Sequence, residues 1–595
     1  MDSEKFMLSI ADYIMFAALL AVSAGIGVFF IFKSKKNTND EYLLAGKDMS
    51  ILPVAFSLMA TFMSATTLMG IPAEMYLYGT NMAFMNIGFI IGPIITSYIF
   101  LPIYFANDIS TAYEYLEKRF GKTTRKITSA MFVIQNLLFT SATLYAPALA
   151  LSAVTSLSMW MSVISVGLVC TFYCTLGGMK AVLWADVFQA ALMFVCLFAV
   201  IVQGCLLLGG IRAVFDIADE GGRLFIPKFS FDLGAHYTFI NIFAQGMIIT
   251  MSSYGGGQCQ VQRLMTVRNL KRSRIAAFIS IPMIVSFQLL CCVCGLVLYA
   301  YFRYCDPMSS NNTPIHSADQ LMPYFISVTL GHLPGIPGLC ICGIFSASLS
   351  TVSSAINSLA SVATEDFIRP MFPKLNVTAL HTKIMSLVFG IVCIALSFII
   401  ASLGHLIKMS VIIYGNLAGP NLAVFLLAAC TTTANEGGVI LGIVTSIILA
   451  CCISFIPENK TDSFLPLSNE CTSLEQTQLN TSFVSTFTSF QNYTKYSYSN
   501  ATVTSFNATT TDEGDTFHIS YMWVSTIALI ACWVIGYVGS VIISLYKGKP
   551  EDVPEILLCP IRNRFSKRNL KNKVSERKDD DELETKPSSK DETKF

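Results

Sequence analysis

The chain has 595 residues, of which 53% are hydrophobic and only 13% are charged. A soluble protein carries about 25% charged residues, so this composition excludes an ordinary soluble protein and indicates a chain embedded in the lipid bilayer. The formal net charge of +1 gives no general attraction to nucleic acid.

Apolar runs long enough to cross ~30 Å of hydrocarbon recur along the chain. About thirteen spans are predicted, at 11–33, 51–78, 82–105, 127–156, 159–178, 183–208, 238–258, 274–302, 322–360, 380–403, 408–430, 437–456 and 520–545. The ninth range is too long for one crossing and is expected to hold a short re-entrant or interfacial helix before a membrane helix near 337–360. The pattern predicts an all-α membrane domain over 1–546 and a charged, disordered tail over 547–595.

Lys and Arg in the short loops predict the orientation of the chain. With the N-terminus outside, the basic clusters near 33–36, 118–126, 263–274 and 369–374 all face the cytoplasm, as does the C-terminal tail. The polar loop 457–519 then lies outside, where Asn-x-Ser/Thr sites can be glycosylated. The predicted acceptors are Asn311, Asn459, Asn480, Asn492, Asn500 and Asn507.

Most of the 18 cysteines lie inside apolar runs, where they are expected to be small packing residues. Cys305 and Cys471 fall in predicted extracellular loops and could pair as a disulfide in that oxidising compartment. The chain ends in Thr593, Lys594 and Phe595. Such an ending can add as a strand to a PDZ domain, and the alternative is that it has no partner.

Two spans are interrupted in a way that is typical of broken transporter helices, which expose carbonyls and helix ends inside the membrane. The second span contains Thr61, Ser64, Thr66, Thr67, Gly70 and Pro72. The seventh contains Gly255, Gly256 and Gly257, followed by Gln258. Because the two spans lie five apart, they predict two five-helix repeats with a site between the breaks. The alternative is close helix packing through small residues.

The ninth and sixth spans carry candidate ligands for a cation. Ser350 and Thr351 share a helical face with Ala347, and hydroxyls combined with freed carbonyls suit Na+, a hard cation. Alternatively, these hydroxyls bond back to the preceding turn of their own helix. Asp186 lies early in the sixth span with Gln189 one turn later. An acid there is either functional or meets the helix dipole at the membrane interface.

Taken together, these residues resemble the sodium:solute symporter family, in the branch of the sodium-coupled monocarboxylate, multivitamin and iodide transporters. The resemblance covers about 1–455 and 520–546 and rests on SLMATFMSA, STAYEYLEKRFG, LYAPALAL, CTFYCTLGGMKAVLWADVFQ, QVQR, LPGIPGL and FSASLSTVSSAINSLASVATEDFIRP. It implies thirteen helices with a LeuT-like core of two inverted five-helix repeats. It also implies a plasma-membrane symporter that couples Na+ to a small organic anion, such as a monocarboxylate or a carboxylate vitamin.

The family pattern carries over to this chain residue by residue. The better-supported sodium site is implied to use the carbonyls of Ala60, Met63 and Ala347 and the hydroxyls of Ser350 and Thr351. The second sodium site is implied at Thr61, Asp186, Gln189 and Gln258. The substrate is implied to lie near Thr67, Asn86 and Phe139.

Some residues depart from the family pattern. Iodide transporters carry Gln and Tyr where this chain has Thr67 and Phe139, which favours an organic anion over iodide. The branch usually has YGVNQ where this chain reads YGGGQ over 254–258, and the extra glycines are expected to remove side chains from the pocket wall.

Other functions are kept as alternatives. They are an iodide or other inorganic-anion transporter, a sodium channel, and a sensor with the same fold. A channel would conduct Na+ without substrate, whereas a symporter would saturate with substrate. A membrane enzyme is not expected, because the six histidines lie in loops or near the ends of spans.

Overall fold

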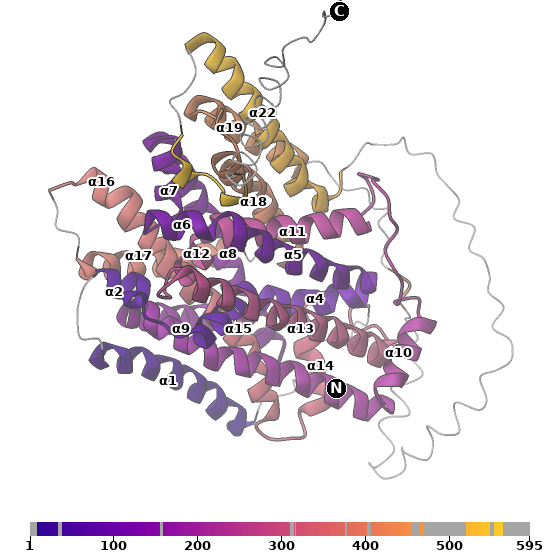
Figure 1. The fold of residues 1–595 in the computed structure, drawn as a ribbon. Coiled ribbons are helices and arrows are strands. Elements are labelled where there is room, and N and C mark those ends of the chain that lie inside the picture. Colours follow the sequence, from indigo (N-terminus) through magenta and orange to yellow (C-terminus); the bar gives the residue numbers. More distant parts are fainter. Residues whose placement is uncertain are drawn as a thin grey trace, which may run out of the picture.

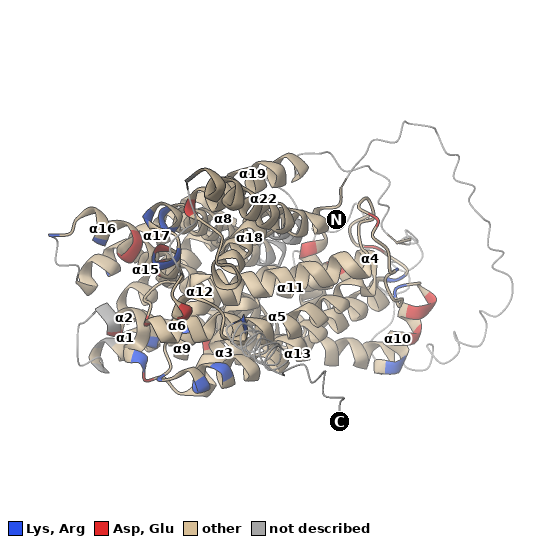
Figure 2. Cartoon of the chain, turned by 45° about the horizontal axis from the view of Figure 1, so that its top comes forward, with Lys and Arg blue, Asp and Glu red and all other residues tan. Residues whose placement is uncertain are grey.

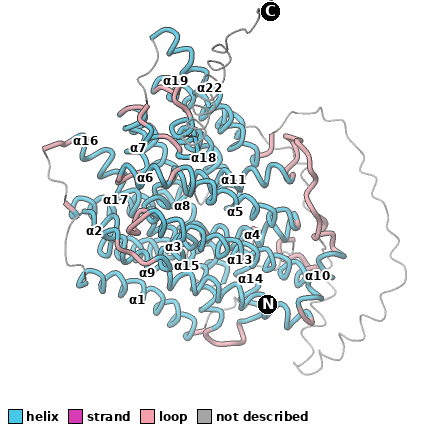
Figure 3. Tube along the Cα trace, in the orientation of Figure 1, coloured by secondary structure: helices cyan, strands magenta, loops and turns pink. Residues whose placement is uncertain are grey.

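The computed structural model describes residues 9–33, 39–154, 159–309, 315, 317–374, 378–400, 406–454, 465–467, 519–547 and 553–562. Long helices run roughly side by side across the view of Figure 1. Figure 3 shows helices joined by loops, and no strand occurs among the described residues. The predicted all-α class is therefore confirmed.

The long helices are α1 (Ile10–Lys33), α3 (Ile51–Phe62), α4 (Ala65–Tyr78), α5 (Met85–Ile99), α8 (Lys122–Val154), α9 (Met159–Leu208), α11 (Phe239–Gly256), α13 (Leu270–Phe302), α15 (Ile336–Val362), α17 (Ala379–Ile400), α18 (Leu406–Cys430), α19 (Glu436–Ser454) and α22 (Val524–Lys547). Shorter helices are α2 (Asn39–Leu44), α6 (Leu101–Asn107), α7 (Ala112–Arg119), α10 (Ile211–Glu220), α12 (Gln258–Leu264), α14 (Leu321–Leu330) and α16 (Arg369–Met371).

When the described helices are judged by length and hydropathy alone, fewer of them could cross a membrane than the thirteen spans that the sequence predicts. Ten described helices are long and apolar enough to cross a membrane, or eleven if the bent pair α3–α4 counts as one span. The 50-residue α9 would be about 75 Å long if straight, far more than a bilayer needs. Gly178 breaks α9 with a φ of 59°, between the predicted fifth and sixth spans. Counting α9 twice and α11–α12 once would give thirteen, which stays a prediction.

The ninth predicted range divides as expected into the short α14 and the membrane helix α15. The start of α15 is held by α1, because Asp12 Oδ1 accepts hydrogen bonds from the backbone N–H groups of Gly335 (3.0 Å) and Gly338 (2.8 Å). A carboxylate at a helix N-terminus satisfies unpaired amides and complements the helix dipole. This contact fixes the position of α15, which carries the candidate cation ligands.

Most of the Lys and Arg positions among the described residues lie at one end of the bundle, near α16, α17 and α2 in Figure 2. An ion-pair network lies at this basic end. Asp366, in a wide π-type turn that continues α15, accepts from Arg125 Nε (2.9 Å), Ser129 Oγ (2.6 Å) and Thr111 Oγ1 (2.8 Å). The network joins α15 to α7 and α8.

The prediction of a disordered tail is wrong for one segment, 553–562. The side chains of Leu557, Leu558 and Cys559 are buried against the bundle. The Cys559 N–H donates to the Ala429 carbonyl at the end of α18 (2.9 Å), and Tyr115 of α7 donates to the Leu557 carbonyl (3.0 Å). A run of only four apolar residues, at 556–559, in a charged region is too weak a signal to predict this docked segment.

Removal of the docked segment is expected to destabilise the protein. A chain that ends at Asp552 loses the burial of Leu557 and Leu558, each worth about 1.5–3 kcal/mol. A chain that ends at Arg562 keeps the segment and serves as the control. Thermal unfolding in detergent should show a lower melting temperature for the shorter chain only. Equal melting temperatures would show that the segment adds no stability.

Several predicted features lie outside the described residues. These are the glycosylation acceptors Asn311, Asn459, Asn480, Asn492, Asn500 and Asn507, the cysteine Cys471, and the ending Thr593, Lys594 and Phe595. Cys305 is described and is disulfide-bonded. Its pairing with Cys471 stays a prediction.

Candidate functional site

The first broken helix supplies free carbonyls at its break. Helix α3 ends at Phe62 and α4 begins at Ala65, and the two are bent by 55°. Met63 (φ −90°, ψ 100°) and Ser64 (φ −93°, ψ 174°) are extended, so the helical hydrogen-bond pattern stops there. The carbonyls in the last turn of α3 therefore lose their partners within the helix and can bind other groups.

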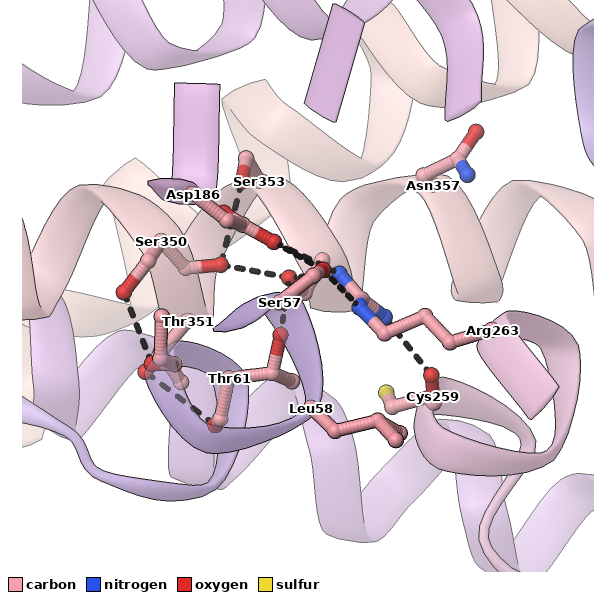
Figure 4. A network of polar contacts seen from close by, with 12 residues as sticks. Ser57, Leu58, Thr61, Asp186, Cys259, Arg263, Ser350, Thr351, Ser353 and Asn357 are labelled. Atoms are coloured by element: carbon pink, nitrogen blue, oxygen red, sulfur yellow. Dashed lines mark hydrogen bonds and ion pairs between the residues drawn. The ribbon is translucent and has the colours of Figure 1, made fainter. Parts of the chain in front are cut away.

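Two hydroxyls of α15 face this break. Ser350 Oγ lies 2.9 Å from the Ala60 carbonyl oxygen and 3.2 Å from that of Ala347. Thr351 Oγ1 lies 3.4 Å from the Thr61 carbonyl oxygen and 3.1 Å from that of Ala347. We call this group of hydroxyls and carbonyls the cradle. Both residues are buried, and Figure 4 shows them directed at the α3 segment that carries Thr61.

The cradle fits Na+ by its chemistry. A hydroxyl that donates to a carbonyl can rotate its hydrogen away and offer a lone pair to a cation instead. Five or six such oxygens without a carboxylate suit Na+ better than a divalent ion. No group of three or more His, Cys, Asp or Glu side chains that could hold a metal ion occurs in the described part of the chain. Met63, the fifth predicted ligand, lies at the break itself.

The second broken helix is interrupted at Gly257 (φ −87°, ψ 113°), between α11 and α12. Its glycines pack closely rather than opening a pocket wall. A Cβ on Gly255 would lie 2.8 Å from the ring of Phe100, and one on Gly256 would lie 2.7 Å from the ring of Phe425. Tyr113 donates a hydrogen bond of 3.0 Å to the Gly256 carbonyl. The expectation that the extra glycines remove side chains from a pocket wall does not fit the contacts of Gly256, whose Cα packs against the Phe425 ring.

A buried ion pair lies beside the cradle. Arg263 of α12 and Asp186 of α9 are both fully buried, with Nη2 and Oδ2 3.4 Å apart. Ser57 of α3 donates to the same carboxylate oxygen and accepts from Arg263 Nε at 2.7 Å. Arg263 Nη2 also donates to Ser354 of α15. Figure 4 shows the side chains of Ser57, Asp186 and Arg263 pointing toward one another.

The residues predicted for the second sodium site separate into two groups. Thr61 Oγ1 lies 2.9 Å from Ser354 Oγ, which connects it to the Arg263–Asp186 pair. Gln189 is fully buried one turn after Asp186. Gln258 instead accepts from the Ala112 N–H (2.8 Å) and donates to the Ser110 carbonyl (3.2 Å), both at the start of α7.

The three predicted substrate residues come from three helices. Thr67 is half-buried in the first turn of α4, where its N–H lies 3.1 Å from the Ser64 carbonyl oxygen. Asn86 of α5 donates to the Ala83 carbonyl at 3.0 Å. Phe139 of α8 makes an edge-to-face contact with Tyr414 of α18, with ring centres 4.6 Å apart. Among the described residues, no hydrogen bond or ring contact joins these three to one another.

Sequence reasoning missed Arg263 as a site residue. It was grouped with the basic cluster 263–274 that faces the cytoplasm, yet its side chain has no exposed surface. The signal that could have identified it is its position on the short helix directly after the second break, four residues after Cys259 and on the same helical face.

Comparisons with known proteins identify the family of the chain. The sodium:solute symporter family model matches residues 42–446. The chain is 36% identical over 574 residues to sodium-coupled monocarboxylate transporter 2 of Bos taurus, across 95% of this chain and 88% of the relative. It is 36% identical over 544 residues to a putative sodium-dependent multivitamin transporter of Drosophila melanogaster, across 90% of this chain and 87% of the relative.

A solved structure shares the fold. It is the substrate-bound outward-open state of a Na+-coupled sialic acid symporter, with a TM-score of 0.71, 20% identity and coverage of 90% of this chain and 98% of that chain. The chain thus has the LeuT-like transporter fold that the family resemblance implies. These relatives are transporters rather than enzymes. From the family match and from relatives aligned over nearly its whole length, the chain belongs to the sodium:solute symporter family.

Proposed function

We propose that this protein is a symporter that imports a small organic anion, a monocarboxylate or a carboxylate vitamin, across the plasma membrane with Na+ by alternating access. Its N-terminus lies outside and its C-terminus in the cytoplasm. The names of the relatives support the substrate class, since they are sodium-coupled monocarboxylate and sodium-dependent multivitamin transporters. The basic loops support the orientation.

The observation that carries this proposal is the convergence of Ser350 and Thr351 on the carbonyls freed at the break of α3. A cation in the cradle would join α15 to the first broken helix. In the LeuT-like arrangement, ions bind at such breaks and the repeats move around them. Binding of Na+ would therefore favour one arrangement of the helices, and the substrate would be bound in that arrangement.

A second Na+ would bind near Asp186 and Gln189. Asp186 Oδ1 and both polar atoms of the Gln189 amide are buried and meet no hydrogen-bond partner among the described residues. Buried polar atoms nearly always have a hydrogen-bond partner, so the two unpartnered oxygens, one of Asp186 and one of Gln189, are candidate ligands for a cation. Thr61 is connected to Arg263 and Asp186 through Ser354. Gln258 would join only if its amide left Ser110 and Ala112.

The number of sodium ions decides how strongly the carrier can concentrate its substrate. One Na+ with a monoanion is electroneutral and yields about 1.4 kcal/mol from a tenfold gradient. Two Na+ yield about 4.4 kcal/mol at a potential of ~70 mV, because one net charge also moves.

The variant Asp186→Asn tests the second site. In cells that express the wild-type protein, addition of substrate in the presence of Na+ should elicit an inward current. Asp186→Asn should weaken the dependence on Na+ and remove most of the current, while a slower electroneutral uptake persists. Voltage clamp and uptake in the same cells measure both. An unchanged current with the same apparent affinity for Na+ would rule out this assignment.

Uptake of a radiolabelled panel tests the proposed function as a whole. Lactate, butyrate, biotin, pantothenate and iodide would be offered to expressing cells in sodium or choline medium. At least one organic anion should be accumulated in sodium only, with saturation. Accumulation of iodide alone, or a sodium conductance that needs no substrate, would contradict the proposal in favour of the inorganic-anion or channel alternative.

A further inference from the structure

We propose that Arg263 competes with Na+ for Asp186 as a tethered cation, so that sodium binding releases the inner half of the second broken helix. The inference rests on the proposed sodium-coupled function and adds a coupling residue to it. Arg263 lies on α12, the short helix that follows the break at Gly257. Its guanidinium therefore connects that helix directly to the second candidate sodium site.

Arg263 holds four elements together. Its Nε donates to Ser57 of α3 (2.7 Å), and its Nη1 donates to the Cys259 carbonyl of α12 (2.6 Å). Its Nη2 donates to Ser354 of α15 and lies 3.4 Å from Asp186 Oδ2 of α9. Helices α3, α12 and α15 also form the two breaks and the cradle. A change in the position of this one side chain would thus affect four helices that carry candidate sodium ligands or a break, α3, α9, α12 and α15.

The ion pair between Arg263 and Asp186 has a longer contact than another buried ion pair in the same protein, Arg125 with Asp366. Arg125 donates to Asp366 through both Nε and Nη2, and the hydroxyls of Ser129 and Thr111 donate to the same carboxylate. The Asp186 carboxylate has a single long contact with Arg263. Both Arg125 nitrogens donate to the same oxygen, Asp366 Oδ1, and short charge-assisted bonds are the strong ones, so the Arg125 pair is held more firmly than the Arg263 pair.

The unsatisfied side of Asp186 points to a second cation. Asp186 Oδ1 meets no partner among the described residues, and neither does the neighbouring Gln189 amide. A cation bound there would lie close to the guanidinium in a buried site, where like charges repel strongly. Na+ and Arg263 would therefore exclude each other at this carboxylate. Arg263 would move away as Na+ binds, and α12 would move with it.

Ser354 connects this exchange to the cradle. Its hydroxyl contacts Arg263 and Thr61 and donates to the Ser350 carbonyl (2.5 Å). When Arg263 moves away from Asp186, Ser354 loses the hydrogen bond from Arg263. The hydrogen bonds that Ser354 makes with Ser350 and Thr61 can then rearrange. Occupation of one sodium site would thus alter the affinity of the other, which is a coupling between sites in the thermodynamic sense.

The test compares Arg263→Gln with Arg268→Gln, which removes an exposed arginine just beyond α12. Loss of the competitor should lower the half-saturating Na+ concentration of Arg263→Gln by about tenfold, a typical coupling factor between two sites. Arg268→Gln should match the wild type. Sodium-dependent uptake in expressing cells measures both.

A second readout needs no transport. Cys259 is half-buried on α12, with its Sγ 3.5 Å from Asn136 Oδ1, so its alkylation rate reports movement of that helix. Mass spectrometry of the Cys259 peptide from purified protein gives this rate in sodium and in choline. The wild type should change its rate with Na+. Arg263→Gln should have the same rate in both media, because α12 is already released.

An unchanged half-saturating concentration, together with a Cys259 rate that still responds to Na+, would overturn the inference and leave Arg263 a structural residue. If Arg263→Gln does not fold, Arg263→Lys is used instead. It keeps the charge without the planar fork and should also lower the half-saturating concentration, so an unchanged value overturns the inference. A wild type without any sodium dependence would instead overturn the proposed function.

Discussion

Substitution of both cradle hydroxyls, Ser350→Ala with Thr351→Val, is expected to abolish sodium-driven uptake in a protein that still folds. The hydroxyls lie 2.9 Å and 3.4 Å from carbonyl oxygens at the break of α3, and they are the only cradle ligands that side-chain substitution removes. An interaction with a charged group is worth about 1.5–3 kcal/mol, so each lost ligand should raise the half-saturating Na+ concentration by about tenfold or more. Uptake as a function of Na+ concentration measures the effect.

Ser348→Ala is the matched control for this experiment. Ser348 lies on the same helix, but its hydroxyl donates to the Thr143 carbonyl of α8 (2.8 Å), away from the break. It should leave the apparent affinity for Na+ unchanged. If Ser348→Ala and the double variant behave alike, the hydroxyls of α15 serve packing, and the cradle is not a sodium site.

Asp366→Ala is expected to be the most destabilising single substitution at the basic end. The carboxylate is fully buried, and its loss leaves Arg125, itself only 13% exposed, without its main partner. Removal of one partner of a buried pair costs about 3–5 kcal/mol. Thermal unfolding of the detergent-purified protein should show a clearly lower melting temperature and a reduced yield of monodisperse carrier.

The control for this prediction is an exposed ion pair. Arg212 and Asp216 of α10 are 3.9 Å apart, with side chains 93% and 67% exposed. Exposed pairs contribute about 0–1 kcal/mol, so Asp216→Ala should hardly change the melting temperature. If the two substitutions lower the melting temperature equally, the burial of Asp366 does not determine its contribution to stability.

The sequence predicts the helices of this fold well, because each depends on a local pattern. Apolar length identifies the spans, and the polar, glycine-containing interruptions identify both breaks, at Met63 and at Gly257. The common face of Ser350 and Thr351 follows from helical spacing alone. That this face meets the carbonyls of the second span does not follow from spacing, and it was expected only from the resemblance to a family.

Contacts between distant segments could not be predicted from the sequence. Arg263 and Asp186 are 77 residues apart, and the contacts of the arginine with Ser57, Asp186 and Ser354 form only when distant helices come together. Gly256 packs on Phe425, far along the chain, so its small size reflects a close approach rather than an open wall. The docked segment 553–562 was missed for the same reason, since it is ordered by surfaces of α7 and α18.

Flux of radioactive Na+ into proteoliposomes that contain the purified protein tests the central claim most directly. An organic anion identified in the uptake panel should stimulate Na+ entry several-fold in the wild type. The Ser350→Ala, Thr351→Val double variant should show no stimulation, although it is folded. Sodium entry that the anion does not change, or equal stimulation in the double variant, would contradict sodium-coupled transport through the cradle.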